Sequence, residues 1–456
     1  MSWEPVPVHG AWQRPWTFIA AVAATVIGLG NVWKFSWLAG QHGGGGFVLA
    51  YLLCLLLVAL PLLIAELVLG ARGRADPVHA MATLQVEVPA GRGWLALGWL
   101  AGLAALLVLA YLSVVAAWLL DYVTALAGGR LEAVSGRQAG QHFAELLADP
   151  RRQLMWHGIF LLTAAVVVAL GVRRGLGALA RLLVPVLIAL LLGLVHYAWR
   201  YGDMAAGLRF LFELRREQIH ADMLLAALGQ AFFSLGIGMG AMMTYGAYAP
   251  RRHSLVAMTA AVAGLDVLVA LLAGLAIFPL VFSLHVEPNY GPGLMFVTLP
   301  YAFGNTPYGM LAGTAFFVLM GLITLGTAVA LLEPGTAWLV QRLGWRRPLA
   351  ALVLAALSWL PGVLVIGNLS WWPEASWQGR NLLGWLDAVT AHLLLPLVGV
   401  MIALFAGWRL RAEVARDELF QSRPWVVGLW RLLLRWLVLP AVVAVLVTGL
   451  YSLGWG

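Results

Sequence analysis

The stretch Val26-Ile27-Gly28-Leu29-Gly30-Asn31-Val32-Trp33-Lys34-Phe35 lies in the middle of the first long apolar segment of the chain. It places two glycines, an amide and a cation where an unbroken membrane-spanning helix would be apolar. Each glycine costs up to about 1 kcal/mol in a helix interior, so the pair weakens the helix where Asn31 can turn inward. Backbone groups released inside a bilayer must face protein or a water-filled cavity. The stretch therefore predicts a helix broken at mid-membrane depth, with a binding site at the break. The alternative is a glycine pair for close helix packing beside a buried, satisfied asparagine.

The composition excludes a soluble globular protein. Of the 456 residues, 62% are hydrophobic and 11% are charged, and the mean hydropathy is +0.89. Apolar runs of about 18 residues or more indicate transmembrane helices. They predict eleven spans, at residues 16–38, 45–70, 94–127, 154–172, 176–199, 221–249, 255–285, 308–343, 348–366, 385–410 and 425–453.

The charge pattern predicts the orientation of the chain in the membrane. The net charge is +8, but the basic residues fall mostly in alternate short loops, which is the positive-inside pattern and not a nucleic-acid-binding surface. We therefore expect the segment 1–15 in the cytoplasm and, after an odd number of spans, the C-terminus outside. No cleavable signal peptide is evident, so the first span is retained. Cys54 is the only cysteine, which excludes an intrachain disulfide.

A second glycine-rich stretch lies about 205 residues after the first. The sixth span carries Ser234 followed by Gly236, Gly238 and Gly240, which predicts another broken helix. Two interrupted segments, each leading five spans, indicate an inverted repeat over about 16–200 and 221–410 with an added span at 425–456. Helix ends at such breaks favour anions at one end and cations at the other, which suits a carboxylate substrate carried together with Na⁺.

These residues resemble the neurotransmitter:sodium symporter family, and in particular its shorter bacterial amino-acid transporters with eleven transmembrane helices. The matching stretches cover nearly the whole chain and comprise Gly28 to Phe35, Gly43 to Tyr51, Gln230 to Tyr245, Ala270 to Pro279 and Asp387 to Trp408. The resemblance implies an all-α integral membrane protein with an inverted five-helix repeat like that of the bacterial leucine transporter, broken first and sixth helices, and one extra helix. It implies a solute carrier in the bacterial inner membrane that works by alternating access.

The resemblance also implies sodium sites, because hard cations take oxygen ligands. The first site would be formed by Val26, Asn31, Ser234 and Asp266. The second would be formed by Ala24, Ile27, Ile323 and Thr327, but one of the family's two adjacent hydroxyls is replaced here by Gly326. We expect one or two Na⁺ ions, with Thr324 or water as possible replacements for the missing ligand. Chloride is not expected, because its seventh-helix hydroxyl is replaced by Ala270 and the Asp266 carboxylate supplies a negative charge.

The substrate pocket that the resemblance implies is mostly apolar. Its positions are Val26, Leu29, Gly30, Val108, Leu112, Phe233, Gly236, Met239, Thr327 and Leu331. A bulky hydrophobic or aromatic amino acid, or a close analogue, is the substrate this lining favours. Leu112 replaces a tyrosine whose hydroxyl holds the substrate carboxylate in the family. Tyr111 should not simply take its place, because one residue along a helix turns a side chain by about 100°.

The resemblance implies two gates and leaves two rival interpretations. Lys34, in place of the family's arginine, would pair with Asp387 at the outer gate, and Trp12 and Tyr248 would close the inner side. The rivals are a non-transporting sensor or regulatory membrane protein of the same fold, and proton-coupled transport of a different solute through Asp266 or Glu66. An enzyme is not expected, since no catalytic motif is present. A small-molecule substrate and the lipid bilayer are the expected partners, and the oligomeric state stays open.

Overall fold

The computed structural model describes residues 10–88, 91–214, 220–250, 253–283, 293–419 and 423–453, and within these ranges the chain is helical, with a single isolated β-bridge. Short 3-10 or π-helical pieces are labelled η. In chain order the elements are α1 (Pro15–Val26), η1 (Gly30–Lys34), α2 (Phe35–Gln41), α3 (Gly45–Cys54), η2 (Leu55–Ala59), α4 (Leu60–Gly73), α5 (Pro77–Glu87), η3 (Arg92–Trp94), α6 (Leu95–Ala127), α7 (Gly136–Ala148), α8 (Pro150–Ala169), η4 (Val172–Leu176), α9 (Gly177–Tyr201), α10 (Met204–Phe212), α11 (Ala221–Ser234), α12 (Ala241–Ala247), α13 (Leu255–Ser283), η6 (Leu294–Thr298), α14 (Leu299–Gly304), α15 (Gly309–Leu343), α16 (Arg347–Ser370), α17 (Leu382–Val389), η7 (Thr390–Leu394), α18 (Leu395–Leu404), η8 (Phe405–Arg409), α19 (Ala412–Glu418), α20 (Pro424–Leu433), η9 (Leu434–Val438) and α21 (Leu439–Ser452).

Each of the eleven predicted spans coincides with helix. Nine continuous helical stretches among the described residues are long and apolar enough to cross a membrane, and α1 with the bent continuation η1 and α2 makes a tenth. The shorter pair α11 and α12 occupies the predicted sixth span. Several predicted boundaries were wrong by a few residues. For example, the fourth span begins at Pro150, because the Asp149 side chain accepts a hydrogen bond from the Arg152 amide and caps α8.

The first span breaks at its glycine pair, as the sequence predicts. α1 ends at Val26, and the piece formed by η1 and α2 continues at 60° to it. The Asn31 side chain accepts a hydrogen bond from the Gly28 amide (3.2 Å), and the Asn31 amide donates to the Gly28 carbonyl (3.1 Å). The asparagine thus satisfies backbone groups that the break would leave bare in the bilayer.

The sixth span, formed by α11 and α12, can break only because glycines stand at the break. Gly236, Gly238 and Gly240 all have positive φ, at 61°, 85° and 68°, a conformation that side chains with a Cβ rarely adopt. A Cβ on Gly238 would also lie 2.9 Å from the Leu395 carbonyl oxygen. The freed Gly238 amide donates to the buried carboxylate of Glu66 on α4 (2.9 Å). Glu66 therefore holds the break between α11 and α12 through backbone contacts.

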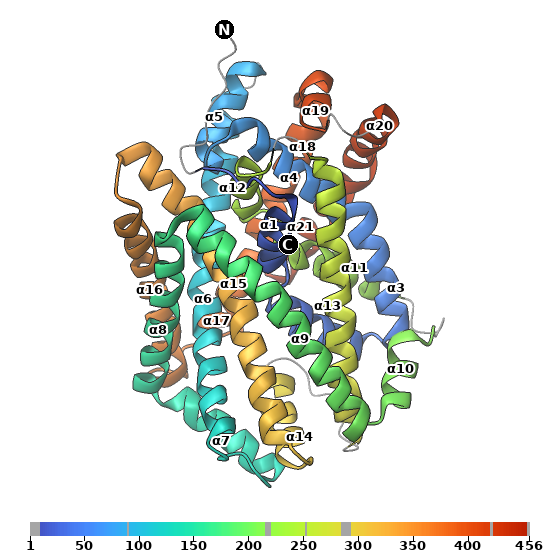
Figure 1. Cartoon of the computed structure of the whole chain (residues 1–456), viewed down its shortest axis with the longest axis vertical. Helices are drawn as coiled ribbons and strands as arrows, with labels where there is room; N and C mark the ends of the chain where they lie inside the picture. Colours follow the sequence, from blue (N-terminus) through green and yellow to red (C-terminus); the bar gives the residue numbers. More distant parts are fainter. Residues whose placement is uncertain are drawn as a thin grey trace.

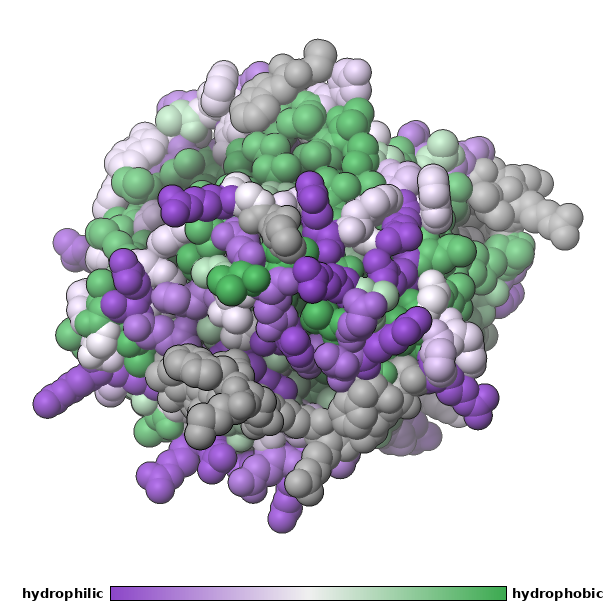
Figure 2. All heavy atoms as spheres, turned by 90° about the horizontal axis from the view of Figure 1, so that it is seen from above, coloured by the Kyte–Doolittle hydropathy of each residue, from purple (hydrophilic) through white to green (hydrophobic). Residues whose placement is uncertain are grey.

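The two broken helices lie at the centre of the molecule. α1 packs against α9, α13 and α15, and α12 packs against α4. Figure 1 shows α6, α15, α9 and α13 running between the two ends of the molecule, with α8 and α16 on one flank. The helices α5, α12 and α19 lie at the end nearest the N-terminus, and α7 and α14 lie at the opposite end (Figure 1). Figure 2 shows that hydrophilic residues gather over the face nearest the N-terminus.

Helices outside the spans cover the two ends. One of these is α7, which begins with a capping box between Ser135 and Gln138. The helix α5 was not predicted, although Asp76 accepts from the amides at 78 and 79 and Pro77 stands at its first position, which is an N-terminal pattern legible in the sequence.

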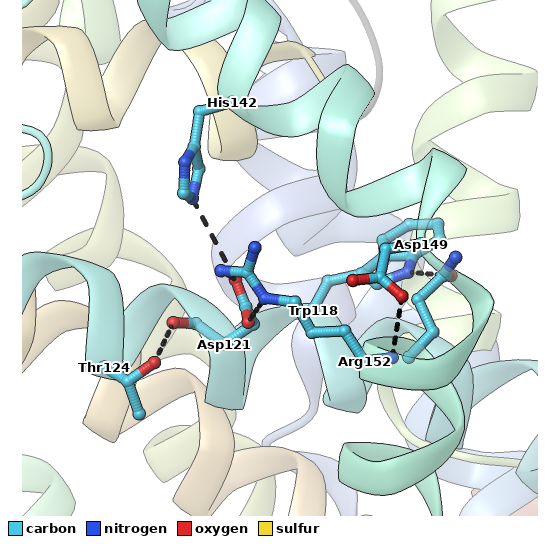
Figure 3. A network of polar contacts seen from close by, with 7 residues as sticks. Trp118, Asp121, Thr124, His142, Asp149 and Arg152 are labelled. Atoms are coloured by element: carbon cyan, nitrogen blue, oxygen red, sulfur yellow. Dashed lines mark hydrogen bonds and ion pairs between the residues drawn. The ribbon is translucent and has the colours of Figure 1, made fainter.

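A polar network fastens α6, α7 and α8 at the end opposite the N-terminus (Figure 3). The two oxygens of the buried Asp121 carboxylate accept from Nε and Nη2 of Arg152, and the His142 ring points toward the same carboxylate with 3.9 Å between Nε2 and Oδ2. Trp118 donates its indole N–H to Gln153 Oε1 (2.9 Å). These contacts hold α7 in a defined position at the ends of α6 and α8.

Candidate substrate and ion site

One cavity of about 300 Å³ lies where the two breaks face α6 and α15. All ten pocket positions predicted from the sequence line it, namely Val26, Leu29, Gly30, Val108, Leu112, Phe233, Gly236, Met239, Thr327 and Leu331. Asn31 and Ser234, beside the two breaks, give the lining polar groups, and Lys34 and Asp387 add two charged side chains. The cavity thus combines polar groups at the helix breaks, apolar walls and a pair of opposite charges.

A cluster of buried oxygens lies beside the polar end. Asp266 on α13 is fully buried and accepts from Asn31 Nδ2 (2.6 Å) and from Ser234 Oγ (2.7 Å). Tyr51 on α3 donates to Asp266 Oδ2 (2.8 Å), the same oxygen that accepts from Ser234, and its hydroxyl lies 3.2 Å from Ser234 Oγ. Three of the four predicted first-sodium residues are therefore in direct contact, and the fourth, Val26, ends α1 and lines the same cavity.

This cluster offers the oxygen ligands that a sodium ion needs. A carboxylate with hydroxyl and amide oxygens around it offers hard oxygen ligands. A fully buried acid with only neutral partners also favours a counter-cation. The Gln230 side chain adds a link, since its Nε2 donates to the Gly30 carbonyl (2.9 Å) and ties the second broken span to the first.

The predicted second sodium site lies where α1 approaches α15. Thr327 Oγ1 donates to the Thr25 carbonyl (3.2 Å) and lies 3.4 Å from the Ile323 carbonyl. A Cβ on Gly326 would lie 2.3 Å from the Ala24 carbonyl oxygen, so the glycine allows this close approach. Ile27, whose amide donates to Ala23 O, ends α1 nearby.

Thr324 does not supply the missing hydroxyl. Its Oγ1 donates to the carbonyl of Met320 one turn back on α15 (2.7 Å), and the side chain is fully buried outside the cavity lining. A second ion between α1 and α15 would therefore depend on backbone carbonyls and the single hydroxyl of Thr327.

The replacement of tyrosine by Leu112 leaves the cavity wall without a hydroxyl at that position. Leu112 and Tyr111 both line the cavity. The angular offset between these neighbouring positions of α6 therefore does not point Tyr111 away from it. The Tyr111 hydroxyl is buried and has no hydrogen-bond partner among the described residues. The sequence argument missed this second lining residue, because a wide cavity can be reached from two neighbouring positions of one helix.

The predicted outer gate residues Lys34 and Asp387 both line the cavity. No ion pair within 4.0 Å joins them in the described part of the chain. The Lys34 ammonium lies over the Phe233 ring, 4.5 Å from its centroid, in a cation–π contact. The gate role of Lys34 and Asp387 stays a prediction.

Trp12 and Tyr248, the residues predicted to close the inner side, pack together. Trp12 is buried, donates its amide to the Tyr248 carbonyl (3.0 Å), and packs edge-on against Tyr248 and Tyr245. Its indole N–H donates to the Val172 carbonyl (3.2 Å). The two predicted residues are therefore in direct contact, and their role as a gate stays a prediction.

An ion pair at this inner end was not predicted. Tyr248 donates its hydroxyl to Glu333 Oε1 (2.7 Å), and the other carboxylate oxygen of Glu333 pairs with Arg347. Arg347 also donates to the Val168 carbonyl (2.8 Å). Glu333 inside an apolar span was the available indication, but its partner lies on the next helix, which no local pattern identifies.

Comparisons with known proteins agree with this geometry. The sodium:neurotransmitter symporter family model matches residues 9–132 and 148–452. The sodium-dependent transporter YhdH of Bacillus subtilis is 32% identical over 423 residues, which are 91% of this chain and 90% of YhdH. A sodium-dependent transporter of Haemophilus influenzae is 25% identical and covers 96% of this chain and 98% of its own length. The crystal structure of MhsT in complex with L-phenylalanine has a TM-score of 0.87 and 34% identity, and covers 96% of this chain and 99% of MhsT.

Proposed function

Because the chain belongs to the sodium:neurotransmitter symporter family, we propose that it imports a hydrophobic or aromatic amino acid together with Na⁺. It is a sodium-dependent symporter and not an enzyme. The proposal concerns the substrate, the ions and the orientation. The observation that carries it is a cavity that has mostly apolar walls and reaches polar residues at two helix breaks.

The cavity lining supports an amino acid with a bulky apolar side chain. Val108, Met239 and Leu331 offer apolar contact, and methionine adapts its shape to different side chains. The helix that starts at Gly30 presents backbone N–H groups without intrahelical acceptors, and these suit a carboxylate. MhsT, which is similar over almost its whole length, holds L-phenylalanine in its crystal structure.

We propose that Na⁺ binds at Val26, Asn31, Ser234 and Asp266, with a second and weaker ion at Ala24, Ile27, Ile323 and Thr327. The buried Asp266 carboxylate supports the first site, because it has neutral partners only. The loss of one hydroxyl at Gly326 supports a weak second site. The N-terminus is proposed to lie in the cytoplasm and the C-terminus outside, on the charge pattern of the loops.

A thermal-shift screen tests the substrate and the coupling ion together. The purified protein is heated with each of the twenty amino acids in NaCl and in KCl. We expect L-phenylalanine, L-tryptophan or L-leucine to raise the melting temperature in NaCl only. Equal shifts in both salts would point to proton coupling, and no shift with any amino acid would contradict an amino-acid substrate.

Chloride should not be required. Ala270 is buried and carries no hydroxyl, while the Asp266 carboxylate already supplies negative charge to the cluster. Uptake of labelled substrate into proteoliposomes should be the same in sodium chloride and in sodium gluconate. A collapse of uptake in gluconate would contradict this expectation.

A further inference from the structure

Lys34 is the only lysine among the 456 residues, and the other 27 cationic side chains of the Lys and Arg total are arginines. Lysine and arginine differ physically. The ammonium is a compact charge on a flexible stem, whereas the guanidinium is a rigid planar fork suited to bidentate pairing. The single lysine lies at the edge of the cavity, where an interdomain ion pair would favour arginine. Its position therefore calls for an explanation other than gate pairing.

The ammonium of Lys34 lies close to the first helix break. It is 4.5 Å from the centroid of the Phe233 ring. The same ring lies against the break, since a Cβ on Gly30 would be only 3.1 Å from Phe233 Cδ1. Side chains on a helix lean toward its N-terminus, and η1 begins at Gly30, so Lys34 leans back toward the break. The Lys34 ammonium, the Phe233 ring and the helix break at Gly30 therefore lie next to one another.

Among the described residues, the cavity lining contains a single cationic side chain, that of Lys34. Leu112 provides no hydroxyl, and the Tyr111 hydroxyl, which does line the cavity, is a neutral donor. Lys34 and Asp387 are the charged side chains that line the cavity there, and they are not paired with each other. A carboxylate that enters the cavity would meet one available cation.

We propose that the Lys34 ammonium binds the carboxylate of the transported amino acid, together with the backbone amides at the first break, and so compensates for the hydroxyl missing at Leu112. Lys34 is then a specificity-determining residue of the transport site. The inference rests on the proposed amino-acid substrate. It assigns to Lys34 a direct contact with substrate, whereas a gate residue would act only through Asp387.

A ligand series with one side chain tests the assignment. L-phenylalanine, L-phenylalaninamide and phenethylamine share the benzyl group and differ at the carboxylate. Their dissociation constants are measured in NaCl for the native protein and for Lys34→Gln, Lys34→Arg and Asp387→Asn. Lys34→Gln should weaken L-phenylalanine about ten- to hundredfold, as expected for a lost charge-assisted hydrogen bond, and should leave the amide and the amine nearly unchanged. Lys34→Arg, which keeps the charge, should lose less.

The outcomes separate the two roles of Lys34. A gate that closes over any ligand would make Lys34→Gln and Asp387→Asn weaken all three ligands alike, and that result would overturn the proposal. If the native protein binds the amide as tightly as L-phenylalanine, carboxylate recognition is absent and the proposal also fails. If no hydrophobic amino acid binds the native protein at all, the proposed function has failed first, and this inference fails with it.

The lone lysine also gives a direct spectroscopic measurement. Reductive methylation with ¹³C-formaldehyde places one methyl label on Lys34, and its NMR signal is identified as the one missing from Lys34→Arg. L-phenylalanine in NaCl should shift this signal, and L-phenylalaninamide at saturation should shift it much less, although both bring the same aromatic ring. Equal shifts from both ligands would contradict a contact between Lys34 and the carboxylate.

Discussion

Asp266 brings a full negative charge into a group of neutral donors at the centre of the molecule. Asn31, Tyr51 and Ser234 all donate to it, and each comes from a different helix. Four helices therefore meet at one carboxylate. A cation at this place would neutralise the charge and hold the helices together, which links ion binding to the closed arrangement of the site.

Asp266→Asn keeps the shape of this side chain and removes its charge. We expect the apparent affinity for Na⁺ to fall a hundredfold or more, because removing one partner of a buried charge pair costs about 3 kcal/mol. The measurement is a Na⁺ titration of substrate binding. Asp222→Asn changes an exposed acid on α11 and is the control. An unchanged Na⁺ dependence in Asp266→Asn would refute the first sodium site.

Leu112→Tyr restores a hydroxyl to the cavity wall. A hydrogen bond to a charged group contributes about 1.5 to 3 kcal/mol, so L-phenylalanine should bind roughly ten- to hundredfold more tightly to the variant. Binding of L-phenylalaninamide should change little. Titration calorimetry with both ligands measures the difference, and weaker binding of both would show that Leu112 serves only to fill space.

At the scale of the elements, the contact between α1 and α15 depends on a missing side chain. Gly326→Ala would place a methyl group 2.3 Å from the Ala24 carbonyl oxygen. Such overpacking costs roughly 1 to 3 kcal/mol, and it would push apart the two helices at which we propose the second ion site. We expect a lower melting temperature and a weaker response to Na⁺.

The matched control is Gly321→Ala on the same helix. A Cβ at Gly321 would make an ordinary contact, 3.8 Å from Leu120 Cδ2. Thermal unfolding of both variants with and without Na⁺ gives the comparison. Equal behaviour of the two variants would mean that the close approach of α1 to α15 has no role in stability or ion binding.

Local patterns in the sequence were sufficient to predict the membrane-spanning helices and the two breaks, but not α5. Glycines at alternate positions predicted both breaks, because positive φ and tight approaches restrict those positions to glycine. The fold, with its broken first and sixth helices, is confirmed by the similarity to MhsT. Apolar length predicted eleven spans, since a helix that crosses a bilayer must be long and apolar.

Contacts between distant elements could not be predicted in this way. Glu333 and Arg347 pair across the turn from α15 to α16, and the Lys34 ammonium lies over the Phe233 ring. These choices depend on side-chain reach and on how whole helices pack, and neither is encoded in a local spacing. The resemblance to a family identified which residues meet, but it did not identify which of two partners a charged side chain selects.

At the scale of the whole molecule, the outer polar network makes stability depend on pH. Burial, and next the Arg152 guanidinium, lower the pKa of His142, while the carboxylates of Asp121 and Glu145 oppose this effect and the nearby Arg130 adds to it. The pKa of His142 in the folded protein therefore lies below that of an unfolded histidine, about 6.5. The unfolded chain binds this proton more readily, so stability falls as the pH drops below about 6.5.

His142→Gln should remove this part of the pH dependence. The melting temperature of the native protein should fall more between pH 7.5 and pH 5.5 than that of the variant. His196→Gln, at an exposed position of α9, is the control and should follow the native protein. A variant with the same pH dependence as the native protein would show that protonation of His142 does not lower the stability of the folded protein.

The hydrogen bond from Gln230 to the Gly30 carbonyl has a mechanical consequence. It joins α11, in the last turn or so before the second break, to Gly30 at the first break, so the two spans cannot hinge independently without losing a buried bond. The two spans should therefore move together as one rigid body relative to α6 and α15. Spin labels on α2 and α11 should then keep a constant separation through the transport cycle, while labels on α2 and α6 should report two distances whose populations change with Na⁺.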